Sequence, residues 1–214
     1  MAPKEKYKEP QEPKEIHGKL IKSSEFKIWK QEHPQSFLSH IFSRVVFSDK
    51  VPDNVSDKVP DKSLPFEIGY YDPLEKKITT FIQQEKKNKQ GEERNNFIFQ
   101  PPQEVFQEKE NAVEQLYLKK IKISLHHAQQ KFVKESTKQF PQVTVQQGFI
   151  ILQCLQGNTL WNISGITSAF SVVNVKIHAE TGDLLGIQQI EVVRKEKGEA
   201  VRKEKGQTET SNLL

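Results

Sequence analysis

Apolar residues alternate with polar ones, or form short apolar runs, along four segments in the second half of the chain. Both patterns are typical of strands. In VVNVKIHA (172–179) one side carries Val173, Val175 and Ile177, and the other carries Asn174, Lys176 and His178. Such a strand turns one face to a core and one to solvent. The segments 148–156, 159–167 and 184–193 predict three more strands.

Two short turns connect these strands. Gly157-Asn158 separates two apolar runs, and both residues tolerate the positive φ of a two-residue hairpin turn. Thr181, Gly182 and Asp183 form the second turn, in which Gly182 suits a left-handed position. The four strands are therefore expected to be antiparallel.

A helix is expected before the strands. In LHHAQQKFVKESTKQF (125–140), apolar residues recur at helical spacing, Ser124 is a suitable N-cap and Pro141 ends the helix. The apolar stripe of this helix can cover one face of the sheet, which gives an α+β layer.

The first half repeats this order in looser form. Ser24 could cap a helix in EFKIWKQEH, residues 36–47 predict a strand, and residues 65–81 predict two strands joined by an Asp-Pro turn. We expect an α+β fold of antiparallel sheets, each packed on a helix, in two structurally similar halves. The alternative is one continuous sheet to which the first half adds unrelated strands.

The composition suggests four regions. Residues 1–22 and 194–214 are expected to be disordered charged tails, because they mix charges and hold few residues that could form a core. The N-terminal half spans 23–103, with exposed loops at 48–63 and 83–96, and the C-terminal half spans 104–193. The connector 104–123 places Val105, Val113, Leu116 and Tyr117 on a helical stripe.

The second half resembles the PepSY domain over about residues 121–190. The resemblance is carried by ISLHHAQQKFVKE followed by FPQV, by the strand with LWNIS, and by VVNVKIHAETGDLLG. Ala128 stands at the family's helix alanine, Trp161 at its strand aromatic, and His178 replaces the usual Asp of the closing hairpin. The resemblance implies a cystatin-like α+β fold and an interaction module without enzyme activity. Some PepSY domains occur in propeptides of secreted metallopeptidases.

The net charge of +4 resides in the tails. Each tail carries six basic and four acidic residues, and the remainder carries twenty of each sign. A polyanion-binding face would need a local excess of basic residues, which the core lacks. A nucleic-acid-associated protein that uses its basic tails remains the alternative function.

No catalytic, metal-binding or cofactor-binding constellation is expected. The adjacent His126 and His127 point about 100° apart on a helix, so they cannot share one ion without further ligands. Cys154 lies between Leu152 and Leu155, which favours a buried, inert thiol over a nucleophile paired with either histidine.

We therefore expect a non-catalytic protein- or peptide-interaction module. The candidate contact surface consists of Trp161, Asn162, Ser164, Asn174, Lys176 and His178. The chain shows neither a long apolar segment nor a secretory signal, so no membrane span and a cytoplasmic location are expected. The partner and the oligomeric state stay open.

Overall fold

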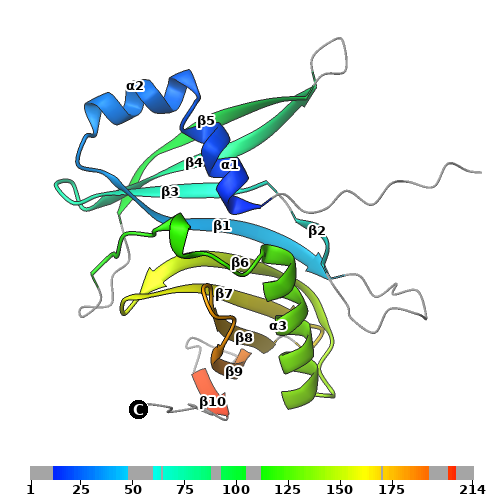
Figure 1. Cartoon of the computed structure of the whole chain (residues 1–214). Helices are drawn as coiled ribbons and strands as arrows, with labels where there is room; N and C mark the ends of the chain where they lie inside the picture. Colours follow the sequence, from blue (N-terminus) through cyan, green and yellow to red (C-terminus); the bar gives the residue numbers. More distant parts are fainter. Residues whose placement is uncertain are drawn as a thin grey trace, which may run out of the picture.

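One continuous antiparallel sheet forms the centre of the molecule. The computed structural model describes residues 12–47, 60–63, 65–87, 93–104, 112–169, 171–192 and 202–205. The strands of the first half are β1 (Phe37–Phe47), β2 (Pro60–Ser63), β3 (Glu67–Asp72), β4 (Lys77–Lys87) and β5 (Glu93–Glu104). Those of the second half are β6 (Val145–Leu155), β7 (Asn158–Thr167), β8 (Ser171–His178), β9 (Leu184–Val192) and β10 (Arg202–Lys205). The ten strands lie in the order β10-β9-β8-β7-β6-β1-β3-β4-β5, with β2 beside β1 (Figure 1).

The two halves meet where β1 pairs with β6. The pairing runs from His40 opposite Gln153 to Val46 opposite Gln147. The expected α+β arrangement of separate, cystatin-like sheets, each packed on its own helix, is therefore wrong. The physical reason is that β1 and β6 carry apolar residues on both faces, a pattern that suits central strands with neighbours on either side.

The three α-helices of the described residues pack against the same side of this sheet, which we call the helix side. They are α1 (Pro13–Leu20), α2 (Ser24–Glu32) and α3 (Leu125–Gln139), and a short 3-10 turn, η1 (Leu118–Lys120), precedes α3. The ring of Phe81 in β4 lies 5.4 Å from Phe26 and 5.0 Å from Trp29 of α2, measured between centroids. Phe132 of α3 lies 5.3 Å from Phe47 of β1. One hydrophobic core thus runs under all three helices.

Gly165 of β7 allows α3 to approach the sheet. A Cβ atom at this position would stand 2.8 Å from Cζ of Phe132 and 2.5 Å from Cγ1 of Val145. Because glycine has no side chain, the Phe132 ring can lie directly on β7 and is fully buried.

Helix α1 lies within the region that was expected to be a disordered tail. Its Ile16 and Leu20 are 0% exposed. Glu12, at the N-cap position of α1, accepts the backbone N–H of Leu125 with both carboxylate oxygens, at 3.1 and 3.2 Å. The ordered chain therefore begins earlier than the expected boundary at residue 22, and α1 is fixed to the start of α3. Residues 1–11 of the expected tail lie outside the described residues.

Several other expected boundaries differ from the structure. Much of the loop expected at 83–96 belongs to β4 and β5, which pair with each other. Within the second expected tail, residues 202–205 form β10, which pairs with β9. Most of the loop expected at 48–63 lies outside the described residues, although 60–63 form β2. The helix expected in the connector is absent over 112–117, where the chain is extended or irregular.

The helix caps and turns are close to their expected positions. Ser124 caps α3 as expected, since its Oγ accepts the N–H of His127 at 3.2 Å. Ser23, rather than Ser24, caps α2. The β6–β7 turn is formed by Gln156 and Gly157, with φ of 52° and 78°, so it begins one residue earlier than expected and Asn158 opens β7. Gly182 adopts φ 80° in the β8–β9 turn.

None of the helices in the described part of the chain is long and apolar enough to span a membrane.

Candidate functional site

The side of the sheet opposite the helices carries two rows of side chains aligned by strand register. We call this side the outer face. One row follows the pairs Ile98–Ile82–Glu67–Phe42–Ile151–Asn162–Lys176 across β5, β4, β3, β1, β6, β7 and β8. The next row is Arg44–Phe149–Ser164–Asn174–Gln188. None of the three described α-helices packs on this face.

The centre of the outer face is apolar and partly open. Phe42 of β1 and Phe149 of β6 stack with ring centroids 5.9 Å apart and an angle of 27° between planes. Both rings and the neighbouring Ile151 are only half-buried, and Ile98 at the β5 end of the row is 44% exposed. Phe42, Phe149 and Ile151 thus form a partly exposed apolar cluster, and such clusters often mark an interaction site in a protein.

The part of the outer face on β7 and β8 is polar and hydrogen-bonded to itself. The Asn174 side-chain amide donates to Asn162 Oδ1 at 2.6 Å and to Ser164 Oγ at 2.8 Å. Asn174 and Ser164 are only 8% and 4% exposed. Because these groups are already paired, covering them costs less desolvation free energy than covering unpaired polar groups would.

The structure divides the six predicted contact residues. Asn162, Ser164, Asn174, Lys176 and His178 lie on the outer face by register and alternation. The imidazole of His178 is occupied in the turn, where Nδ1 accepts the N–H groups of Glu180 and Thr181 at 3.3 and 3.2 Å.

Trp161 does not belong to this surface. It is 1% exposed on the helix side, and its indole N–H donates to the carbonyl of Ile123 at 3.2 Å. Trp161 is therefore a core residue.

The apolar residues of the outer face were not anticipated. Phe42, Phe149 and Ile151 lie in apolar runs rather than in clean alternation. Such runs indicate a strand with apolar side chains on both faces, and this signal could have identified them.

His40 lies on the outer face beside these rings. A Cβ atom at Gly69 of β3 would stand 2.2 Å from the His40 ring, so the glycine provides the space that the ring fills. Burial lowers the pKa of His40. Its Nδ1 lies 3.0 Å from Ser39 Oγ, which itself donates to the carbonyl of Gly69. The imidazole of His40 is therefore uncharged at neutral pH, and it adds a half-buried ring to the outer face.

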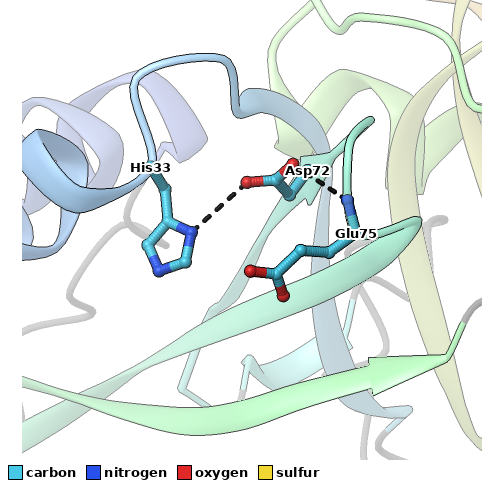
Figure 2. Close-up of side chains that lie close together, drawn as sticks. All are labelled: His33, Asp72 and Glu75. Atoms are coloured by element: carbon cyan, nitrogen blue, oxygen red, sulfur yellow. Dashed lines mark hydrogen bonds and ion pairs between the residues drawn. The ribbon is translucent and has the colours of Figure 1, made fainter.

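A second group of polar side chains lies at the β3–β4 turn. Ligand atoms of His33, Asp72 and Glu75 all lie within 4.8 Å of one another. Figure 2 shows His33 directed at Asp72, with Nδ1 3.3 Å from Oδ2. His33 is the C-cap of α2, and Asp72 ends β3. No sequence motif connects these residues, because the helix end and the turn meet only in the folded chain.

Asp72 also organises the turn that follows it. Its Oδ1 accepts the N–H groups of Leu74 at 2.9 Å and Glu75 at 3.3 Å. Burial acts to raise the pKa of Asp72, but these two hydrogen bonds and the contact with His33 outweigh burial and lower it. Asp72 therefore carries its negative charge at neutral pH.

A shallow depression of about 590 Å³ lies between α1, α2, β1 and the connector. At its base, His17 Nε2 lies 2.7 Å from the hydroxyl of Tyr70. Burial lowers the pKa of His17 and raises that of Tyr70, so the pair is neutral at physiological pH. Lys30 borders the same depression, and its Nζ donates to the Ser36 carbonyl at 2.6 Å.

Among the described residues, the hydrogen-bond acceptor of Cys154 is a carboxylate rather than a base. Its thiol donates to Glu114 Oε2 at 3.1 Å, and Glu114 also accepts the N–H of Gly157 at 2.8 Å. Burial, together with the Glu114 carboxylate, raises the pKa of Cys154 to about 11. Neither His126 nor His127 is among the described contacts of Cys154, which fits an unreactive thiol.

Comparison of the chain with protein-family models, curated proteins and solved structures yields no match. The resemblance to the PepSY domain thus rests on the residues quoted for it and stays a prediction.

Proposed function

We propose that this chain is a non-catalytic interaction module that binds another protein through the outer face of its sheet. The observation that carries the proposal is the half-buried apolar centre at Phe42, Phe149 and Ile151, which no described helix covers. Interfaces bury a central apolar and aromatic cluster within a more polar rim, and this face has that composition.

The charges on this face favour a partner with carboxylate groups. Arg44 ends one row beside Phe149, and Lys176 stands beside Asn162 in the other. A second copy of the chain would bring Arg44 and Lys176 toward the same two cations. Among the described residues of these rows, only Glu67 is acidic and could offset that repulsion. A different protein, with apolar residues next to Asp or Glu, complements the face better.

The resemblance of residues 121–190 to the PepSY domain agrees with a contact role, since members of that family resemble interaction modules. The nucleic-acid alternative assigns binding to the basic tails, most of which lie outside the described residues. The only basic residues in the described rows of the outer face are Arg44 and Lys176. This face therefore lacks the row of positive charges that a polyanion would need.

The test is site-directed photo-crosslinking in cells of the natural host. A photoreactive residue at position 151 should yield one discrete crosslinked protein, whereas the same residue at Ile28, which is 61% exposed on α2, should not. Phe149→Ser should abolish the crosslink by removing the aromatic stack, and Arg44→Glu should weaken it by reversing the charge.

Three outcomes would contradict the proposal. One is a crosslink to a second copy of the chain. Another is a crosslinked protein that survives Phe149→Ser. The third is salt-sensitive retention on immobilised polynucleotide that is unchanged by Phe149→Ser and accounts for all binding, which would favour the nucleic-acid alternative.

A further inference from the structure

We propose that His33, Asp72 and Glu75 form a binding site for one divalent transition-metal ion of the Zn²⁺ class. The site lies at the β3–β4 turn beside the end of α2 (Figure 2). It does not depend on the interaction proposed for the outer face.

The distance between the first two ligand atoms suits a metal ion. Two ligands of one tetrahedral Zn²⁺, each about 2.0–2.2 Å from the ion, lie about 3.4 Å apart. His33 Nδ1 and Asp72 Oδ2 lie 3.3 Å apart. A metal ion could therefore replace the proton between these atoms with little movement of either side chain.

Contacts away from the site hold both of these ligands in place. The His33 ring stacks on Trp29 with centroids 4.9 Å apart and an angle of 25° between planes. The Asp72 carboxylate is fixed through Oδ1 by the N–H groups of Leu74 and Glu75, so Oδ2 is left toward His33. Ligands oriented by outer contacts lose less conformational entropy on binding a metal.

Glu75 supplies the third ligand. Its side chain is exposed, and no hydrogen bond or ion pair of its carboxylate is found among the described residues. Its oxygen already lies within 4.8 Å of the other two ligand atoms, and a change of rotamer can close the remaining distance. One imidazole and two carboxylates suit Zn²⁺ and its neighbours, and the two negative charges balance the ion.

The β8–β9 turn holds the same residue types, but their ligand atoms do not all lie within 4.8 Å of one another. His178 Nδ1 is occupied by two backbone N–H groups, and Glu180 pairs with Lys122 at 2.8 Å. Asp183 accepts the hydroxyl of Thr181. This turn provides a matched control, because it has the same residue types without the close spacing of their ligand atoms.

The experiment is titration of the chelator-treated full chain with Zn²⁺ by calorimetry, and with Co²⁺ by visible absorption. We expect one saturable equivalent in the wild type. Glu75→Gln should weaken binding at least about tenfold, since even losing an indirect support of a ligand costs about 10–100-fold. The metal-free melting temperature of Glu75→Gln should match the wild type, because its exposed carboxylate makes no hydrogen bond or ion pair among the described residues.

Two control variants distinguish this site from chance binding. Glu180→Gln and His127→Gln, which alters an exposed histidine, should both leave the affinity unchanged. Absence of saturable binding, an unchanged affinity in Glu75→Gln, or a loss of binding in His127→Gln would each overturn the proposal.

Discussion

The two halves of the sheet are covered by different kinds of side chain. Over the first half, α2 contributes Phe26 and Trp29, which form a cluster of rings with Tyr70 and Phe81. Over the second half, α3 contributes mainly Phe132, which lies on Gly165 near a set of aliphatic strand residues. The first half is thus packed by rings from both α2 and the sheet, and the second by aliphatic side chains around the rings of Phe132 and Trp161.

The polar groups differ in the same way. In the second half, Asn162, Ser164 and Asn174 lie on one sheet face and satisfy one another. In the first half, His33 and Asp72 come from a helix end and a hairpin turn, and they meet at the edge of the core. Alternation along β7 and β8 is enough to predict that Asn162, Ser164 and Asn174 share one face of the sheet. The contact between His33 and Asp72 depends on how α2 packs beside the β3–β4 turn, which no local pattern indicates.

The largest effect should come from removing a core ring in either half. Phe81→Ala and Phe132→Ala should each destabilise the protein by about 3–5 kcal/mol, because both rings are 0% exposed. Since β1 and β6 join the halves in one sheet, both changes should shift a single unfolding transition. The measurement is denaturant unfolding followed by tryptophan fluorescence.

The chain carries one buried tryptophan in each half, Trp29 and Trp161, so single-tryptophan variants report the halves separately. In each single-tryptophan background, Phe81→Ala and Phe132→Ala should both shift the unfolding curve. If Phe81→Ala shifts only the Trp29 signal, the halves unfold independently. Phe81→Leu and Phe132→Leu give a milder version of the test, and Ile28→Ala, at a 61% exposed position, is the control.

A smaller effect is expected at the polar network of the second half. Asn174→Ala removes the donor shared by Asn162 and Ser164 at a site that is 8% exposed. It should destabilise the protein by about 1–3 kcal/mol, the cost of leaving buried polar groups unpaired. The shift of the urea midpoint measures this loss.

The neighbouring Gln188→Ala is the matched control, because Gln188 stands opposite Asn174 in the same row and is half-buried. It should change stability by less than about 0.5 kcal/mol. Equal losses in the two variants would show that the network contributes nothing beyond side-chain packing.

The sequence predicts local elements better than their assembly. β8 and the Ser124 cap of α3 follow from alternation and capping chemistry, and the structure has both. Helix α1 was missed because charged residues surround its two core side chains, Ile16 and Leu20, so composition masks a narrow apolar stripe. The pairing of β1 with β6 joins segments about a hundred residues apart, and no local pattern indicates it, so the sequence does not distinguish one sheet from two.

The candidate sites show the same limit. The polar residues of the outer face could be placed by alternation, whereas Trp161 was misplaced because an aromatic residue in a strand suits either a core or a contact surface. His33 and Asp72 lie 39 positions apart and become neighbours only when α2 packs beside β3.

The smallest expected effect is the acid sensitivity that His17 of the first half contributes to the protein. Burial lowers the pKa of His17 in the folded first half below the 6.5 expected of an unfolded chain. As the pH falls below about 6.5, the unfolded state binds more protons than the folded state, so stability should decline. Melting temperatures between pH 7.5 and 5.5 should therefore fall less steeply in His17→Gln than in the wild type. His127→Gln, on the exposed side of α3, should keep the wild-type slope. If His17→Gln also kept the wild-type slope, the His17–Tyr70 pair would not be a source of acid sensitivity.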